Sequence, residues 1–160
     1  MNIILSLLSM VDAKALFDFE KENKEFFEKS VPARPDSYFV YEEFIHIFEA
    51  LMEEQRNKTS LFYAIKNESG KIIGRMNLVD IDWETRIGHV GYRVGNQFTG
   101  RGVAVNALEK LKSEAALMGV TELQAKTTLD NMPSQKVLER CLFTKDHIDK
   151  EKFIHYSFSL

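Results

Sequence analysis

Residues 97 to 107 combine the groups that can hold a phosphate. The segment reads QFTGRGVAVNA, with Gly100 and Gly102 on either side of Arg101. It follows a strand-like run and opens a helical one, and the first turn of a helix has backbone N–H groups without internal partners. Those groups and the helix dipole favour an anion, while glycine permits close approach of the backbone. The loop therefore predicts an anion site, although a plain strand-to-helix turn would use glycine in the same way.

Four further residues have side chains suited to acid–base chemistry or hydrogen bonding. Asn131 and Ser134 stand at the start of a predicted short helix, where capping and an ordinary first-turn serine are the alternatives to a functional role. His89 lies in the strand before the glycine loop, on the face opposite Tyr92 by alternation. Its side-chain type suits proton transfer, and a structural role is the alternative. Glu84 follows the preceding strand and is either a base or a solvated loop carboxylate.

The cysteine and histidine content points away from metal and disulfide chemistry. The four histidines, at positions 46, 89, 147 and 155, lack ligand spacing with cysteines or carboxylates, so we predict no metal site. The single cysteine, Cys141, lies on the apolar face of VLERCLF and is predicted to be a buried structural thiol. One cysteine allows no disulfide within the chain, which suits a reducing compartment.

The elements that must position these residues follow from hydrophobic periodicity. We predict an order of β-αα-βββ-α-β-α-ββ in a single domain over residues 1–160 of α/β (α+β) class. The first helix runs from about residue 9 until VPARP stops it, and Asp36 or Ser37 caps the second. The expected strands are 2–8, 61–66, 71–81, 86–94, 121–127, 143–148 and 152–160, and the later helices are 103–118 and 131–143.

The amino-acid composition limits the classes of partner and the compartment that we expect. Hydrophobic residues make up 44% and charged residues 28% of the 160, a normal globular mixture, and the net charge of −3 argues against nucleic acid as the main partner. The apolar run at the N-terminus is short, has no basic flank and meets Asp12 at once. We expect neither a signal peptide nor a membrane span, and hence a cytoplasmic protein.

In this context the loop resembles the acetyl-CoA loop of the GNAT superfamily of N-acetyltransferases, whose pattern is Q/R-x-x-G-x-G/A between a strand and a helix. The pattern fits in two registers, starting from Gln97 or from Thr99. We prefer the second register. GYRVGNQFTGRGVAVNAL then matches, without a gap, the family's usual succession of Gly-Tyr, strand end, loop, Gly-Lys/Arg-Gly, small residue and helix. Thr99 in that case replaces the usual Gln or Arg, which leaves its side-chain role open.

Two other segments extend the resemblance over nearly the whole chain. ELQAKTTLDNMPSQKVLERCLF resembles the second family signature through Asn131 and Ser134, with Leu142 where the family usually has Gly. DAKALFDFEKENKEFFEKSVPARPDSY is similar to the N-terminal helices of the RimJ/RimL-type branch, whose members often acetylate protein N-termini. Its acidic residues are predicted to form a solvated face, with the lining of an amine-binding cleft as the alternative.

The resemblance implies a fold. It is a GNAT-like, mixed and mostly antiparallel sheet of about seven strands, flanked by about four helices and splayed between the fourth and fifth strands. It implies acetyl transfer from acetyl-CoA to a primary amine by direct attack, with a ribosomal-type protein N-terminus as the leading acceptor. A small-molecule amine (amino acid, polyamine or amino-sugar antibiotic) and a non-catalytic CoA-binding module are the alternatives. Dimers are common in the family, so a homodimer is one expectation.

The resemblance also implies residue roles. Ser134 is the candidate acid for the leaving thiolate, while His89 and Glu84 are candidate bases beside a water-relayed proton path. Asn131 would hold the pantetheine arm by its side chain. The other acetyl-CoA-binding candidates, acting mostly through the main chain, are Tyr92, Arg93, Val94, Thr99, Gly100, Arg101, Gly102, Val103 and Ala104.

Overall fold

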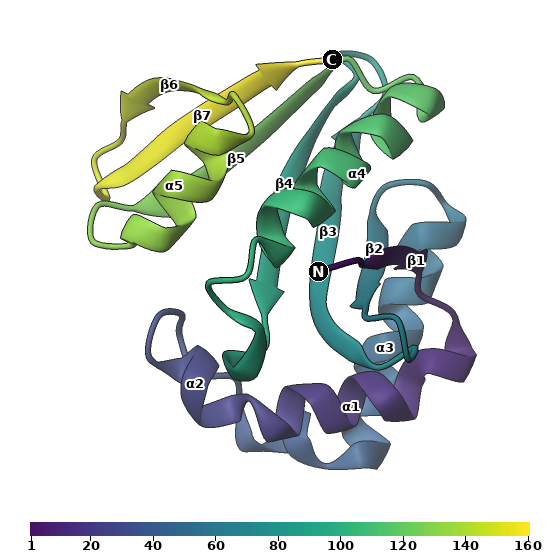
Figure 1. Ribbon diagram of the computed structural model, residues 1–160. Helices are drawn as coiled ribbons and strands as arrows, with labels where there is room; N and C mark the ends of the chain where they lie inside the picture. The colour runs from purple at the N-terminus through teal and green to yellow at the C-terminus, as the bar shows by residue number, and fades with distance from the viewer.

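The computed structural model describes residues 1 to 160, which form one seven-stranded sheet with helices on both faces (Figure 1). The strand order is β1-β2-β3-β4-β5-β7-β6, and every neighbouring pair is antiparallel except β4 and β5. The strands are β1 (Ile4–Leu7), β2 (Leu61–Lys66), β3 (Ile72–Asp82), β4 (Ile87–Val94), β5 (Glu122–Thr128), β6 (Thr144–Ile148) and β7 (Phe153–Ser159). The helices are α1 (Ala13–Glu22), α2 (Lys24–Glu28), α3 (Tyr41–Arg56), α4 (Val103–Met118) and α5 (Met132–Arg140).

The sheet opens between β4 and β5. These strands pair only from Ile87 to His89, opposite residues 122–124, although both continue well beyond that point. Figure 1 shows β4 running down toward α1 and α2 while β5 follows β7 to the other side. The predicted splay between the fourth and fifth strands is confirmed, and it leaves one edge of β4 without a partner strand after His89.

Two hydrophobic cores hold the helices to opposite faces of the sheet. Alternation along β2 sends Phe62 and Ala64 toward α1 and α3, and Tyr63 and Ile65 toward α4. The α4 side chains buried in that second core are Val103, Ala107, Leu108, Leu111 and Ala115. Cys141 of the segment after α5 is fully buried in the same core, as predicted for a structural thiol.

The first helical region is broken where the sequence analysis predicted one continuous helix. α1 ends at Glu22 and α2 begins at Lys24, with Asn23 between them, so the structure has five α-helices. The Asn23 side chain donates to the Phe19 carbonyl and accepts the Asn96 N–H, both at 2.9 Å. An asparagine that bonds backbone groups competes with the helix for them. The break therefore ties the α1–α2 junction to the loop that follows β4.

The second predicted helix starts later than expected. Residues Asp36–Phe39 form a 3₁₀ turn, Val40 is extended, and α3 begins only at Tyr41. Hydrophobic spacing at steps of three and four would place Val40 and Ile47 on the apolar face of this helix, but they are 50% and 40% exposed. Proline at 35 favours an extended or turn entry over a regular helix start. The buried stripe consists of Phe44, Phe48 and Met52.

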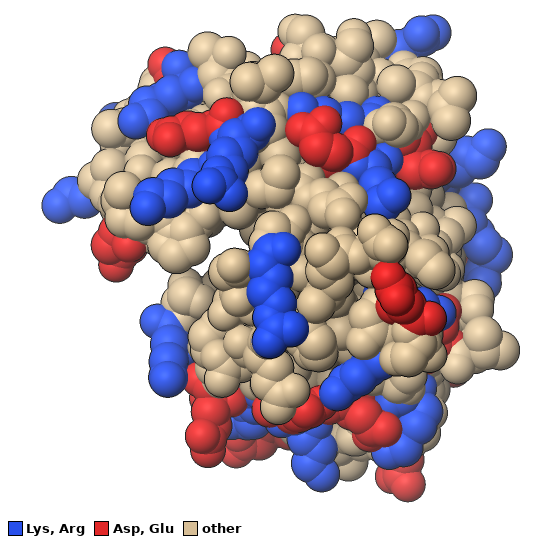
Figure 2. Space-filling model, viewed as in Figure 1, with Lys and Arg blue, Asp and Glu red and all other residues tan.

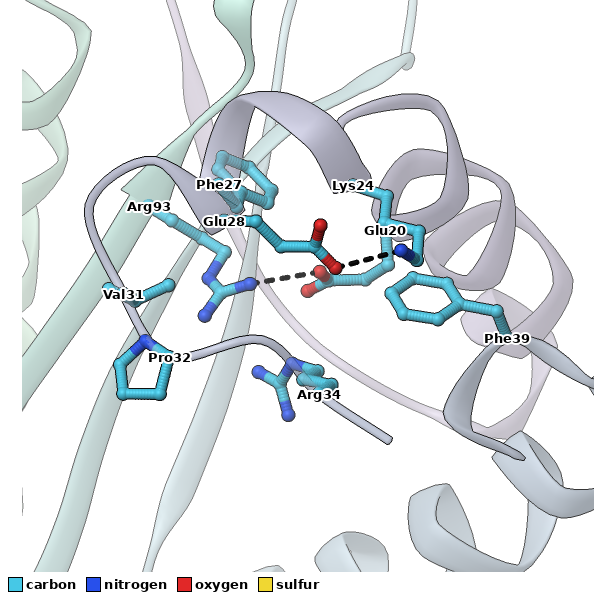
Figure 3. Close-up of a pocket in the computed structure, with 9 residues that line it drawn as sticks. All are labelled: Glu20, Lys24, Phe27, Glu28, Val31, Pro32, Arg34, Phe39 and Arg93. Atoms are coloured by element: carbon cyan, nitrogen blue, oxygen red, sulfur yellow. Dashed lines mark hydrogen bonds and ion pairs between the residues drawn. The ribbon is translucent and has the colours of Figure 1, made fainter. Parts of the chain in front are cut away.

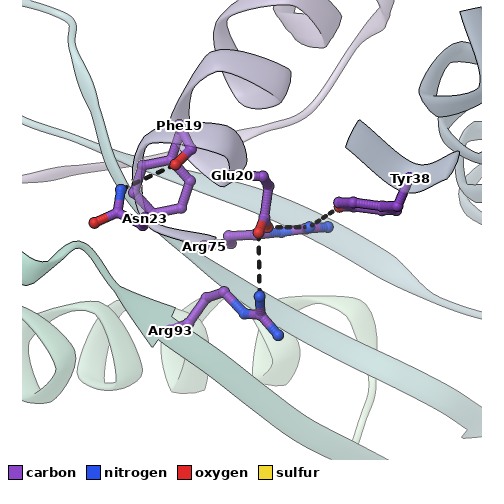
Figure 4. Close-up of polar contacts among 6 residues, drawn as sticks. All are labelled: Phe19, Glu20, Asn23, Tyr38, Arg75 and Arg93. Atoms are coloured by element: carbon purple, nitrogen blue, oxygen red, sulfur yellow. Dashed lines mark hydrogen bonds and ion pairs between the residues drawn. The ribbon is translucent and has the colours of Figure 1, made fainter. Parts of the chain in front are cut away.

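One carboxylate of the acidic N-terminal stretch is buried, against the prediction of a solvated face. Glu20 is 1% exposed and pairs with Arg75 at 2.7 Å and with Arg93 at 3.1 Å (Figure 4). Arg75 and Arg93 stand directly opposite each other on β3 and β4. Like charges in that position destabilise a sheet unless a counter-ion lies between them. Glu20 supplies that counter-ion from α1.

Helices α4 and α5 end in the same backbone motif with different residues. After α4, Gly119 has φ 98°, and the Val120 N–H donates back to the Ala115 carbonyl. After α5, Leu142 has φ 65° and lies in the equivalent place. This is the left-handed position at which helices commonly end with glycine. Gly119 adopts this conformation without strain, whereas the departure at Leu142 places an L-residue in a strained conformation.

Replacing Leu142 with glycine should therefore stabilise the protein by about 1 kcal/mol, because the left-handed conformation costs an L-residue about that much. The leucine side chain is 74% exposed, so little packing is lost. Urea unfolding of Leu142→Gly measures the change. Leu142→Ala removes the same exposed side chain without relieving the backbone, and it should not share the gain.

Candidate active site

A groove runs along the opening of the sheet, between β4 and α5. It encloses about 1260 Å³ of space including open solvent. In Figure 2 the surface is hollowed at this place, with Lys and Arg side chains on both sides of the notch. The lining comes from the 30–31 loop, β4, the 98–105 segment and α5: Ser30, Val31, Tyr92, Arg93, Val94, Phe98, Thr99, Gly100, Gly102, Val103, Ala104, Val105, Asn131, Pro133, Ser134, Lys136, Val137 and Arg140.

The loop before α4 presents a continuous row of unused donors. None of the backbone hydrogen bonds in the structure uses an N–H group of residues 99 to 105. Gly100 and Gly102 have φ of 73° and 76°, and a Cβ added at either would meet no protein atom within 4 Å. The loop therefore has the positive-φ geometry that glycine supplies, and its open side faces space rather than the core. Such a row of N–H groups at a helix N-terminus binds anions.

Ser134 meets a tyrosine across the groove. Its hydroxyl lies 3.2 Å from the phenol oxygen of Tyr92, which reaches it from β4. Burial raises the pKa of Tyr92 to about 12, although the hydrogen bond with Ser134 lowers it somewhat. The phenol thus keeps its proton at neutral pH. Tyr92 was expected to act through its main chain, and its side chain adds a hydroxyl beside Ser134.

Asn131 caps α5 and still has donor capacity. Its Oδ1 accepts the Ser134 N–H at 3.2 Å, which confirms the capping alternative. No hydrogen bond in the structure uses its amide nitrogen, and the residue lines the groove. An asparagine amide offers both an acceptor and two donors. Capping and ligand binding are therefore compatible at this position.

Three predicted residues lie away from the groove lining. Arg101 points its guanidinium over the ring of Phe98, 5.8 Å from its centroid, and does not line the groove. Glu84 is exposed in the turn between β3 and β4, at the other end of β4 from the glycine loop. His89 is exposed at the last paired position of β4 and β5. The structure does not bring Glu84 or His89 into the groove with Ser134.

Sequence reasoning missed two cations on the opposite wall. Lys136 and Arg140 line the groove from α5, one turn apart. Their i, i+4 spacing places both on one face of a helix, so the signal was available in the sequence. The structure shows that this face is the one that looks across at the glycine loop.

Three further observations concern the thiol, metal ligands and helix hydrophobicity. Burial raises the pKa of the Cys141 thiol to about 12, so it stays protonated. The structure groups no three His, Cys, Asp or Glu side chains in a way that could hold a metal ion. No helix is both long and apolar enough to cross a membrane.

Comparison with solved structures finds the same architecture over the whole chain. Ribosomal-protein-S5-alanine acetyltransferase from Vibrio fischeri superposes with a TM-score of 0.91 at 20% identity, covering 99% of this chain and 93% of that one. The microcin C7 self-immunity acetyltransferase MccE, solved with acetyl-CoA and AMP, gives 0.85 at 28% identity, covering 99% and 92%. The predicted fold, including its likeness to ribosomal-protein-alanine acetyltransferases, is thereby confirmed.

Comparison of sequences identifies the family. An N-acetyltransferase of Bacillus licheniformis called p20, itself uncharacterized, is 31% identical over 104 residues, which are 63% of this chain and 57% of the relative. The match thus spans less than two thirds of that relative's length. The family model described as acetyltransferase (GNAT) domain matches residues 2–144. Together with the splayed sheet and the glycine loop before α4, this match shows that the chain belongs to the GNAT acetyltransferase family.

Proposed function

We propose that the protein transfers the acetyl group of acetyl-CoA to a primary amine, which attacks the thioester directly in a ternary complex. The observation that carries this proposal is the row of unused N–H donors at residues 99 to 105, at the end of the groove beside β4. A diphosphate seated there would accept from these groups and from the positive end of the α4 dipole. Lys136 and Arg140 would add charge from the opposite wall.

The unpaired edge of β4 suits the pantetheine arm. Beyond His89 the strand has no β5 partner, so the backbone groups of Tyr92 and Val94 are available to an extended ligand that adds like a strand. Arg93, which was also expected to contribute its main chain, stands opposite Arg75 and turns its backbone groups toward β3, as Gly95 does with Ile73. The free amide nitrogen of Asn131 would donate to the same arm from the start of α5. In this arrangement the thioester would lie at the Tyr92–Ser134 pair, between the two halves of the sheet.

The Tyr92–Ser134 pair would act on the leaving group. As the amine attacks, the carbon–sulfur bond breaks and the sulfur gains negative charge, which a hydroxyl donor stabilises. Ser134 would donate to the sulfur, and the protonated phenol of Tyr92 would donate to Ser134. The amine must shed a proton for the reaction to finish. We propose that water carries it out, because neither Glu84 nor His89 lines the groove.

Replacing Ser134 with alanine should lower kcat about 10²-fold, the usual contribution of a positioned proton donor, and leave the KM for acetyl-CoA largely unchanged. Tyr92→Phe should cost less, about fivefold, because it removes one neutral hydrogen bond. Steady-state thiol release measures both. Ser113→Ala, on the exposed side of α4, is the control and should behave like the unchanged protein. An unaltered kcat in Ser134→Ala would remove Ser134 from the mechanism.

Two acceptor classes follow from the relatives. The Vibrio fischeri structure is described as a ribosomal-protein alanine acetyltransferase, which supports a protein N-terminus as the acceptor. MccE, at the higher identity, is a self-immunity enzyme solved with AMP, which supports a small-molecule amine. A third hypothesis is that the protein binds CoA without catalysing acetyl transfer.

Two assays distinguish a protein N-terminus, a small-molecule amine and CoA binding without catalysis. Acetyl-CoA should raise the melting temperature, because a ligand that binds only the folded state stabilises it by mass action. Thiol release is then measured with a panel of N-terminal peptides, amino acids, polyamines and amino sugars. Turnover with one class identifies the acceptor. A melting shift without turnover on any amine would favour the non-catalytic module, and no shift at millimolar acetyl-CoA would refute the proposal.

A further inference from the structure

A second, smaller cavity adjoins the groove on the side of the N-terminal helices. It comprises about 220 Å³ of space, including open solvent, between α2, the loop that follows it, and β4 (Figure 3). Val31 and Arg93 line both this cavity and the groove, so the two spaces meet at these side chains. An acceptor that reaches the thioester from this side would place its remaining groups in the small cavity. Its lining is Glu20, Lys24, Phe27, Glu28, Val31, Pro32, Arg34, Phe39 and Arg93.

The carboxylates of this cavity already have partners. Both oxygens of Glu20 are used, by Arg75 at 2.7 Å and by Arg93 at 3.1 Å. Glu28 pairs with Lys24 at 2.8 Å, as the dashed line in Figure 3 marks. A cationic acceptor would have to displace an arginine from the buried Glu20, whereas the Lys24–Glu28 pair is about one-third exposed and is weaker. The pairing of Glu20 argues against a role for this carboxylate in an amine-binding cleft.

Arg34 has no such partner. It forms no ion pair, and its Nε is buried without a hydrogen-bond partner. Its guanidinium instead stacks on the ring of Tyr38, with Cζ 4.4 Å from the centroid. Figure 3 shows the guanidinium groups of Arg34 and Arg93 turned toward the same space. The lining holds three cations, Lys24, Arg34 and Arg93, and two carboxylates, Glu20 and Glu28. Glu20 is shared with Arg75, and Glu25 and Asp36 act on Lys24, so Arg34 is the cation of the lining without a paired carboxylate.

Both arginines are held in place by aromatic rings. Arg93 stacks on Phe27, with Cζ 4.6 Å from the ring centroid, as Arg34 does on Tyr38. Burial lowers the pKa of Arg93, and the nearby charges of Arg34 and Arg75 oppose the favourable effect of Glu20. An anion would relieve that repulsion. A rigid guanidinium fork matches the oxygens of a carboxylate or phosphate.

We infer that the acceptor amine carries an anionic group, a carboxylate or a phosphate, and that Arg34 and Arg93 bind it in the small cavity. The inference rests on the proposed acetyl transfer and narrows its acceptor. It predicts that polyamines, which present only positive charge to this cavity, are poor acceptors. Arg34 is then a specificity-determining residue, distant from the reacting atoms.

Matched acceptors that differ only in the anion test this inference. The peptide Ala-Asp-Ala amide is compared with Ala-Asn-Ala amide, and O-phosphoserine amide with serine amide, by thiol release. We expect kcat/KM to be at least about tenfold higher for the anionic member of one pair or both, mainly through a lower KM, as for a hydrogen bond to a charged group. The peptide pair and the phosphate pair distinguish the two sources of the anion.

Variants connect the preference to Arg34. In Arg34→Gln the ratio between anionic and neutral acceptors should fall toward one, and in Arg34→Lys it should fall partway, because charge remains but the fork is lost. Arg56→Gln, an exposed arginine at the end of α3, should keep the ratio of the unchanged protein. Melting temperatures without ligand show whether each variant is folded.

A binding measurement keeps the test independent of turnover. With CoA present, O-phosphoserine amide or Ala-Asp-Ala amide should raise the melting temperature of the unchanged protein but not that of Arg34→Gln. Equal rates and equal shifts for both members of every pair would overturn the inference, while acetyl transfer to neutral amines would still stand. A preference that persists in folded Arg34→Gln would also overturn it. Failure of acetyl-CoA itself to bind would instead refute the proposed function.

Discussion

Replacing Gly102 with valine should weaken acetyl-CoA binding at least about 10³-fold, which is about 4 kcal/mol. Gly102 has φ 76°, and an added side chain at this position points into open space on the groove side of the loop. A valine there would occupy the space next to the N–H groups of residues 99 to 105 and displace the diphosphate. Losing two charge-assisted hydrogen bonds at about 1.5–3 kcal/mol each accounts for the expected size. Calorimetric titration with acetyl-CoA measures it.

Gly70 offers a matched control for this substitution. It has φ 85° in the turn between β2 and β3, and an added Cβ would also meet no atom within 4 Å. Gly70→Val therefore introduces comparable backbone strain away from the groove. It should lose similar stability and retain acetyl-CoA binding. If Gly102→Val bound acetyl-CoA as well as Gly70→Val does, the ligand would not lie against this loop.

Replacing Glu20 with glutamine should lower the free energy of unfolding by about 3–5 kcal/mol, the usual cost of removing one partner from a buried ion pair. The change conserves shape but leaves Arg75 and Arg93 opposite each other without a counter-ion. The Arg75 side chain is only 5% exposed, so water cannot replace the carboxylate. Urea unfolding followed by circular dichroism measures the loss.

Asp18 provides the comparison on the same helix. It pairs with Lys14 at 2.9 Å, but both side chains are more than half exposed. An exposed pair contributes little, about 0–1 kcal/mol, so Asp18→Asn should unfold almost like the unchanged protein. A loss in Glu20→Gln no larger than in Asp18→Asn would show that the two arginines separate or find solvent when the carboxylate is removed.

The local signals in the sequence predicted the succession of elements and the backbone geometry of the glycine loop well. Glycine at positions 100, 102 and 119 marks backbone that needs positive φ, and the structure has positive φ at all three. Asn131 and Ser134, three residues apart, predicted a helix start that the structure confirms. The order of strands and helices followed from periodicity, because each element buries one face whatever its neighbours are.

The helix boundaries that were predicted wrongly depend on contacts with distant parts of the chain. The break at Asn23 exists because its side chain serves both Phe19 and Asn96, and nothing within the helix itself predicts the second bond. The late start of α3 likewise leaves Val40 outside the buried stripe. Hydrophobic periodicity describes one helix at a time and does not predict hydrogen bonds to distant parts of the chain.

The sequence by itself determined the succession of strands and helices along the chain and the glycine loop before α4, because each depends on residues within a few positions of one another. Only the tertiary structure decided that Tyr92 meets Ser134, that Glu20 lies between Arg75 and Arg93, and which basic residues face the two cavities. These contacts join residues 42 to 73 positions apart. Their existence depends on the register of β3 against β4 and on where the sheet opens, which no local pattern encodes.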